Sequence, residues 1–152
     1  MYIIEPEQNE EGIHISDYYL GDGYYDSVMS MECDSFVAKY NGRVIGWSAI
    51  SYNESVPVLQ SLVVDEKYRG MGVSDLLMEY RLDHLKDQGF RYVKTYAWAK
   101  PDGRCNAAKL LHRHKFYNLL NIPDYYSHLV NCPHCGNGNQ CRCSARVYCR
   151  SI

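Results

Sequence analysis

The segment from residue 56 to residue 85 most constrains the fold, because it joins an apolar strand to an amphipathic helix through a loop with two glycines. Residues 56–64 are mainly apolar and predict a strand, whereas apolar side chains recur every three or four positions across residues 73–85 and predict a helix. The loop reads Arg69-Gly-Met-Gly-Val-Ser74. Its backbone amides, at the start of a helix, would suit a phosphate group, although a tight turn alone also requires small residues.

A second local pattern predicts an antiparallel hairpin. Residues 35–40 and 43–51 flank Asn41-Gly42, a pair that supplies the positive φ angles of a type I′ turn. The other predicted elements are a strand at 2–4, two short helices within 13–31, a strand at 91–98, a helix at 105–117 and closing strands at 119–122 and 145–149. The pattern predicts an α/β fold, with a mixed, mostly antiparallel sheet flanked by helices, in a single domain over residues 1–152.

Composition agrees with one domain and excludes several classes of protein. The 152 residues have a mass of 17.6 kDa and are 46% hydrophobic, so neither a disordered chain nor a disulfide-dependent scaffold is expected. No apolar run approaches the roughly 20 residues of a membrane span, and no basic leader precedes an apolar stretch. We therefore expect a cytoplasmic protein without a membrane partner, whose seven cysteines are reduced or bound to metal.

The charge distribution is uneven along the chain. The formal net charge is −2, yet residues 1–38 hold nine of the 18 carboxylates and none of the 16 lysines and arginines. This acidic segment also contains Tyr18, Tyr19, Tyr24 and Tyr25, which would suit a pocket for a cationic ligand. Solvated helix faces explain the same asymmetry equally well.

Four of the seven cysteines lie within twelve residues near the end of the chain. They are Cys132, Cys135, Cys141 and Cys143, spaced Cys-x2-Cys-x5-Cys-x-Cys around a loop rich in Gly and Asn. Four thiolates at short spacings predict a closed tetrahedral zinc site with a structural role. Disulfides are the alternative, and His128 or His134 could replace one thiolate. This cysteine-rich insertion is expected to span residues 127–144.

Residues 62–77 resemble the acyl-CoA-binding motif of the GNAT superfamily of N-acyltransferases, whose signature is Gln/Arg-x-x-Gly-x-Gly/Ala. Arg69 and Gly72 match its first two defined positions. Ser74 stands in place of the final Gly or Ala, and its hydroxyl could cap the helix or contact a phosphate. The resemblance extends over residues 35–126.

The resemblance implies that acetyl-CoA is the co-substrate. Its pyrophosphate would lie on the loop amides, and its pantetheine arm would pair with the backbone of the motif strand like an additional strand. The residues implied to bind it are Leu62, Val63, Val64, Arg69, Gly70, Met71, Gly72, Val73, Ser74 and Asn106.

The resemblance also implies a general acid on the helix at 105–117, where the family often has an Asn and a Tyr. Asn106 can fill the Asn position. Aligning the adjacent pair of leucines puts His112 at the Tyr position, and Tyr117 is the second candidate for the acid.

A general base for the acceptor amine is not assigned. Gln60 occupies a place in the motif strand where a carboxylate would be expected. Glu32, Asp34 and Glu54 are more remote alternatives, and each is also explained as an ordinary surface acid.

The predicted function is transfer of an acetyl group from acetyl-CoA to a primary amine of a small cationic molecule or a protein. The alternative is a protein of the same fold that acts on or binds nucleic acid (tRNA or DNA), with the zinc loop as a docking element. Basic residues that could serve it are Lys109, Arg113, Lys115, Arg142, Arg146 and Arg150. A binding module without chemistry is the third class, which the intact loop disfavours. The oligomeric state is not predicted.

Overall fold

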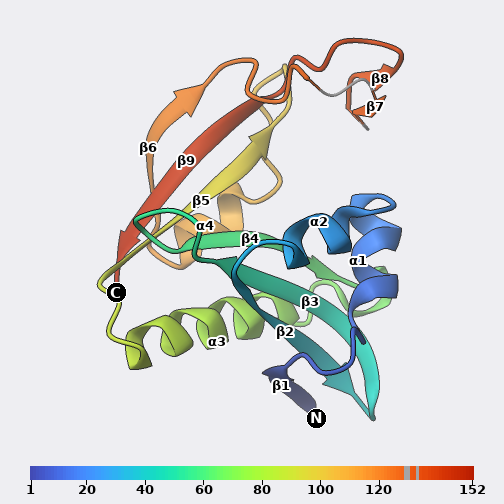
Figure 1. The fold of residues 1–152 in the computed structure, drawn as a ribbon, viewed down its shortest axis with the longest axis vertical. Coiled ribbons are helices and arrows are strands. Elements are labelled where there is room, and N and C mark those ends of the chain that lie inside the picture. Colours follow the sequence, from blue (N-terminus) through green and yellow to red (C-terminus); the bar gives the residue numbers. More distant parts are fainter. Residues whose placement is uncertain (129–130, 133) are drawn as a thin grey trace. The chain divides into compact units, whose positions relative to one another are not determined.

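The computed structural model of the protein describes residues 1–128, 131–132 and 134–152. The chain divides into two units (Figure 1). Unit 1 comprises Met1–Val93 together with Ile152, and unit 2 comprises Lys94–Ser151. A single domain over residues 1–152 stays a prediction.

Unit 1 is built on four antiparallel strands in the order β1-β2-β3-β4. Their bounds are β1 Tyr2–Pro6, β2 Cys33–Tyr40, β3 Arg43–Ser51 and β4 Val58–Val64. The turn between β2 and β3 has positive φ at Asn41 (50°) and at Gly42 (79°), as a type I′ turn requires. The predicted hairpin is confirmed. β4 begins after Pro57 rather than at residue 56, because a proline has no N–H to donate to a ladder.

Helices cover both faces of this sheet. α1 (Ile13–Leu20) and α2 (Tyr24–Met29) pack on the face that carries Val37 and Val63, and α3 (Val73–Asp87) packs on the face that carries Ala38 and Val64. Successive strand residues point to opposite faces, which is why neighbours in the sequence contact different helices. A short 3-10 helix, η1 (Glu66–Tyr68), precedes α3. The helices predicted within 13–31 and at 73–85 are therefore confirmed.

Unit 2 contains three longer strands, among which β9 lies between β5 and β6. Their bounds are β5 Tyr92–Ala99, whose first two residues belong to unit 1, β6 Tyr117–Ile122 and β9 Ser144–Ser151. β6 and β9 pair in antiparallel fashion. The short strands β7 (Asn131–Cys132) and β8 (Gly136–Asn137) form a separate antiparallel pair within the expected insertion at 127–144. Residues 129, 130 and 133 of that insertion lie outside the described residues.

The helix of unit 2 is shorter than expected. α4 covers Ala108–Arg113 instead of residues 105–117, and it is followed by Lys115 with a φ of 65°. An α-helix of L-residues does not continue through this left-handed conformation. The prediction that Tyr117 lies on the helix is therefore wrong, since this residue begins β6.

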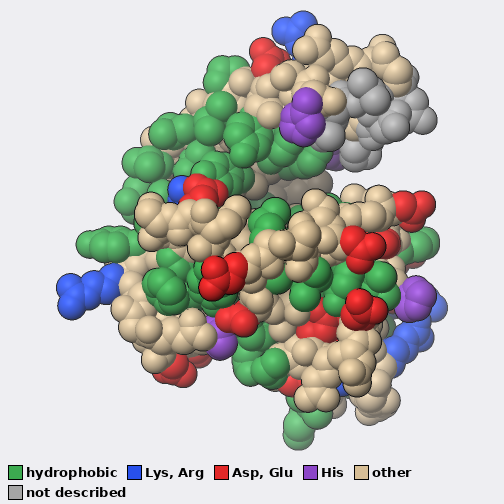
Figure 2. All heavy atoms as spheres, in the orientation of Figure 1, with side chains coloured by type: hydrophobic (Ala, Val, Ile, Leu, Met, Phe, Trp, Pro, Cys, Tyr) green, Lys and Arg blue, Asp and Glu red, His purple; other side chains and the backbone are tan. Residues whose placement is uncertain are grey.

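The visible surfaces of the two units differ in chemistry. Figure 2 shows acidic side chains gathered over α1 and α2, and hydrophobic side chains gathered over the strands of unit 2. The large apolar residues exposed on and after β6 are Tyr117, Leu119, Leu120 and Tyr125. Within the described parts of the chain, no helix is both long enough and apolar enough to cross a membrane.

Candidate functional site

The loop at residues 69–74, called here the motif loop, connects η1 to α3. Gly70 and Gly72 have φ of 78° and 83°, and a Cβ added at either position would meet nothing within 4 Å. The glycines are therefore required by backbone conformation rather than by close packing. Gly72 is the N-cap of α3 and Val73 is its first residue.

The start of α3 has the properties of an anion site. The first N–H groups of a helix have no partner within the helix, and the positive end of its dipole lies there. No side chain caps this helix, and the expected cap by Ser74 is absent, since Ser74 is the second helical residue. The open space at the Cβ positions of Gly70 and Gly72 means that no side chain or backbone atom crowds the loop there, which suits the approach of an anionic ligand.

Arg69 braces the motif loop against β4. Its Nε donates a hydrogen bond of 2.9 Å to the carbonyl oxygen of Val64, the last residue of that strand. The guanidinium carbon also lies 4.9 Å from the centroid of the Tyr19 ring, and the Tyr19 hydroxyl accepts a hydrogen bond from the backbone N–H of Glu66 at 3.0 Å. The basic residue of the motif thus holds the strand, η1 and α1 in one arrangement.

The motif strand β4 contains a bulge. Leu62 is opposite Ser48 and Leu59 is opposite Ile50, so Gln60 and Ser61 together face the single residue Ala49. We call Gln60 and Ser61 the bulge. An extra residue bends the strand and leaves backbone groups outside the regular ladder. Beyond the bulge, residues 62–64 resume regular pairing with β3.

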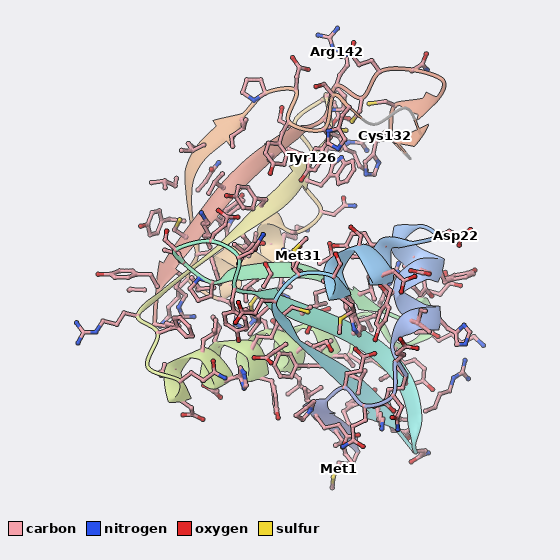
Figure 3. The ribbon with its side chains drawn as sticks, viewed as in Figure 1. Met1, Asp22, Met31, Tyr126, Cys132 and Arg142 are labelled. Atoms are coloured by element: carbon pink, nitrogen blue, oxygen red, sulfur yellow. The ribbon has the colours of Figure 1, made fainter. Side chains whose placement is uncertain are left out.

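Polar side chains converge on the bulge from several elements. Tyr24 of α2 donates a hydrogen bond of 2.7 Å from its hydroxyl to Ser61 Oγ, and Gln60 Nε2 donates one of 2.8 Å to Ser51 Oγ. Burial raises the pKa of Tyr24, which keeps its hydroxyl protonated as the donor. Met31, labelled in Figure 3, follows α2, with its sulfur 4.0 Å from Gln60 Nε2.

The most unusual of these side chains is Arg81 of α3, which is only 2% exposed. Its Nη1 donates to the carbonyl oxygens of Ala49 at 3.0 Å and of Gln60 at 2.8 Å. Burial lowers the pKa of Arg81 to about 9, which still leaves the guanidinium charged at neutral pH. Sequence reasoning missed this residue, although its position four residues after Leu77 and four before Leu85 places it in the buried row of α3.

The expected acid candidates lie in unit 2. Asn106 lies in the turn before α4 and is exposed, and His112 is exposed on α4 with its ring centroid 5.8 Å from that of Tyr148. Tyr117 is 58% exposed at the start of β6, opposite Cys149. The catalytic roles of His112 and Tyr117, and the role of Asn106 toward acetyl-CoA, stay predictions.

Of the remote base candidates, Asp34 is engaged within unit 1. Its Oδ2 accepts hydrogen bonds from the Tyr52 hydroxyl at 2.7 Å and pairs with His84 Nε2 at 3.0 Å. Burial alone would raise the pKa of the Asp34 carboxyl, but these two partners outweigh it and hold the pKa below its ordinary value. A carboxylate with this preference for the charged form is a weak base toward an amine.

A hollow of about 500 Å³ lies beside α1 in unit 1. Tyr18 and Tyr19 line it together with residues of both charges, including Glu11 and Lys67. The other two tyrosines of the acidic segment are elsewhere, because Tyr25 is buried in the core and Tyr24 contacts the bulge. The expectation that all four tyrosines serve one pocket is wrong for this hollow.

The four cysteines of the insertion come together in unit 2 and form the cysteine cluster: Cys132, Cys135, Cys141 and Cys143. Their sulfur atoms all lie within 4.8 Å of one another. Cys143 Sγ is 3.7 Å from Cys132 Sγ and 3.8 Å from Cys135 Sγ. A tetrahedron with zinc–sulfur distances of about 2.3 Å has sulfur–sulfur edges of about 3.8 Å. The separations therefore fit a shared metal ion.

The surroundings of the cysteine cluster also suit charged sulfur ligands. Backbone N–H groups of His134, Arg142 and Cys143 point at sulfurs of the cluster, each at 3.4 Å. Trp98 and Tyr126 pack against it with their rings stacked and the ring centroids 3.9 Å apart. Such donors and apolar walls are typical of structural metal sites. His128 and His134 are not part of the group of potential ligands, which consists of the four cysteines.

Residues 1–116 match the sequence profile of the Acetyltransferase (GNAT) family. The chain therefore belongs to the GNAT family of acetyltransferases, as the resemblance of the motif loop implied. A relative, an uncharacterized N-acetyltransferase of Chlorobaculum tepidum, is 33% identical over 85 residues, which cover 52% of this chain and 55% of that protein. The chain thus spans little more than half the length of this curated relative.

Solved structures resemble the chain over nearly its whole length. A GNAT family acetyltransferase from Elizabethkingia anophelis with acetyl-CoA bound gives a TM-score of 0.79 at 15% identity, covering 99% of this chain and 98% of that one. The ribosomal-protein-S18-alanine N-acetyltransferase from Escherichia coli gives 0.77 at 18% identity, covering 100% and 94%. At such identities the likeness shows the GNAT fold alone.

Proposed function

We propose that the protein transfers an acetyl group from acetyl-CoA to a primary amine of a small cationic molecule or a protein. The motif loop carries this proposal. Two glycines with positive φ and open space at their Cβ positions lead into the first turn of α3, where a pyrophosphate would be bound by N–H groups and the helix dipole. Membership of the GNAT family and a similar structure that binds acetyl-CoA support the same co-substrate.

The residues proposed to bind acetyl-CoA act mainly through their backbone. Val63 and Val64 bury their side chains in the two cores of unit 1, so a pantetheine arm would pair with main-chain groups of residues 62–64 and not with these side chains. Arg69 uses its Nε to hold the loop, and Gly70, Met71, Gly72, Val73 and Ser74 would offer the amides. Met71 is 57% exposed, which suits a side chain that covers a bound ligand.

The reaction requires a proton donor and a proton acceptor. The amine nitrogen forms a bond to the thioester carbonyl carbon, the carbon–sulfur bond breaks, and the sulfur leaves as a thiolate that takes a proton while the amine gives one up. His112 is the proposed acid because its imidazole is exposed on α4 and can donate a proton to the leaving thiolate, and Tyr117 is its alternative. Loss of the alkaline limb of the pH–rate profile in His112→Asn, but not in Tyr117→Phe, would support His112 as the general acid. Loss of this limb in Tyr117→Phe, but not in His112→Asn, would support Tyr117 instead.

The cysteine cluster is proposed to hold one structural zinc ion. Four sulfur ligands would close the coordination sphere of the ion and leave no position for a water or substrate, which favours a structural role for this metal. Reduced thiols of this kind fit the cytoplasmic location that we also propose.

The proposed acceptor is a cationic amine, because acidic side chains gather over α1 and α2 (Figure 2) and Asp22 lies at the turn between these helices (Figure 3). Acetylation of a panel of polyamines, lysine peptides and RNA tests this choice. Asp22→Lys with Asp26→Lys should raise KM for cationic acceptors selectively, and added salt should raise it in the wild type.

The matched control is Arg142→Glu with Arg146→Glu, which reverses two positive charges of unit 2. If this pair abolishes activity and the aspartate pair has no effect, the acceptor is nucleic acid. If the wild type binds acetyl-CoA but acetylates no amine in the panel, the proposed activity is wrong and a binding module remains.

A further inference from the structure

Arg81 is the only charged side chain that is buried among the described residues. Burying a guanidinium is unfavourable unless hydrogen bonds compensate for the lost water. No carboxylate of the described chain forms an ion pair with it, and its Nε is buried without a hydrogen-bond partner. An apolar residue would complete the row formed by Val73, Leu77 and Leu85, so core packing alone does not account for an arginine here.

The compensation comes from the bulge. Arg81 Nη1 donates to the carbonyl oxygens of Ala49 and Gln60, and these residues face each other where β4 has one residue too many. In a regular ladder each carbonyl would receive an N–H from the neighbouring strand, whereas a bulge leaves such groups unpaired. Arg81 Nη1 thus links β3 and β4 at the position where the regular pattern of hydrogen bonds between these strands is interrupted.

Other hydrogen bonds hold the bulge from its remaining sides. Tyr24 of α2 contacts the Ser61 side chain, and Gln60 reaches Ser51 of β3. α2 and α3 cover opposite faces of the sheet, so the bulge is fixed from both. Leu62 follows the bulge directly and begins the stretch of β4 whose backbone is proposed to pair with acetyl-CoA.

We propose that Arg81 is a positioning residue for acetyl transfer, which holds the bulge of β4 so that residues 62–64 present their backbone groups to acetyl-CoA in the productive register. This inference rests on the proposed function. Arg81 is remote from the reacting atoms in this account, because it lies on the α3 face of the sheet and acts through the strand. A displaced strand would misplace the thioester, and a misplacement of about 1 Å costs on the order of 100-fold in rate.

The experiment compares Arg81→Met, Arg81→Lys and a matched control, Leu85→Ala. Leu85 is fully buried one turn further along α3 and makes no hydrogen bond to the bulge, so its truncation destabilises the same helix without freeing the two carbonyls. Each variant is assayed well below its melting temperature for acetyl-CoA affinity, kcat and KM, and for hydrogen exchange of a peptide that covers residues 58–64.

We expect Arg81→Met to lower kcat by about 10-fold to 100-fold and to accelerate exchange at residues 58–64. Arg81→Lys should retain part of kcat, because an ammonium can serve one carbonyl but lacks the planar fork of a guanidinium. Leu85→Ala should lower the melting temperature with kcat nearly unchanged.

The inference is overturned if folded Arg81→Met or Arg81→Lys keeps the wild-type kcat and exchange, or if Leu85→Ala loses the same fraction of kcat. Should Arg81→Met not fold, Arg81→Lys decides alone. A wild-type protein that fails to bind acetyl-CoA would refute the proposed function, and accelerated exchange at the bulge would then show only a structural role for Arg81.

Discussion

The two units of the chain differ in the kinds of residue that they bury. Unit 1 has apolar clusters on both faces of a four-stranded sheet, with Trp47, Ile45 and Leu77 fully buried. In the described part of unit 2, the buried hydrophobic residues include three alanines and three cysteines, and β6 is exposed along almost its whole length. From this difference we expect apolar burial to support the motif loop, and the cysteine cluster to support the region around the insertion.

Metal removal should have the largest effect of the changes considered, and it should affect unit 2 more than unit 1. Protein purified under reducing conditions should carry about one zinc per chain. Structural zinc contributes about 10–16 kcal/mol in small metal-dependent folds. A strong chelator, or Cys135→Ser, should therefore lower the melting temperature and increase hydrogen exchange in unit 2, while acetyl-CoA still binds.

The matched control is Cys105→Ser, a half-buried cysteine of the same unit outside the cysteine cluster. It should leave the metal content and the exchange pattern of unit 2 unchanged. Oxidised thiols without metal in protein prepared under reducing conditions would contradict the zinc proposal.

Leucine truncations in the two units should differ by several kcal/mol. Leu77→Ala removes a fully buried side chain from α3 and should cost about 2–5 kcal/mol of unfolding free energy. Leu119→Ala alters a side chain that is 56% exposed on β6 and should change it by less than about 0.5 kcal/mol. Urea unfolding measures both. Equal costs would show that β6 is covered in solution and would remove the contrast between the units.

The smallest effect is expected from Asp34, whose side chain is 42% exposed in its pair with His84. Because its pKa is lowered in the folded state, the carboxylate stabilises unit 1 above the unfolded pKa of about 3.9, and this contribution disappears as the pH falls through the folded pKa. Asp34→Asn should cost less than about 1 kcal/mol at pH 7 and nothing in strong acid.

The control for this test is Asp22→Asn, an exposed acid of the turn between α1 and α2. Its stability should follow that of the wild type across the same pH range. A destabilisation by Asp34→Asn that persists unchanged at low pH would show that the side chain acts through packing and not through its charge.

Local sequence patterns predicted the hairpin, the motif loop and the cysteine cluster. The turn at Asn41-Gly42, the glycines of the motif loop and the spacing of the four cysteines each require particular residue types at fixed offsets, and each pattern is found where it was expected. The hairpin, the motif strand and its helix could therefore be located without tertiary information.

The features that sequence reasoning missed depend on contacts between distant segments. The bulge is defined by the register between β3 and β4, which a single strand sequence does not show. The burial of Arg81 is explained by its hydrogen bonds to two carbonyl oxygens at the bulge. The end of α4 was misjudged because a lysine rather than a glycine adopts the left-handed conformation there. For the bulge, for Arg81 and for the end of α4, no residue type nearby in the sequence indicates the feature.

The central claim, that acetyl-CoA binds at the motif loop, is tested most directly by calorimetric titration of wild type, Gly72→Glu and Gly89→Glu. Both glycines have positive φ and open space for a side chain, so strain and charge are matched, but Gly72 is the N-cap of α3 whereas Gly89 lies beyond its C-terminal end. Gly72→Glu should weaken acetyl-CoA binding at least about tenfold, the equivalent of 1.4 kcal/mol, and Gly89→Glu should bind like the wild type. Unchanged affinity in a folded Gly72→Glu protein would contradict the account.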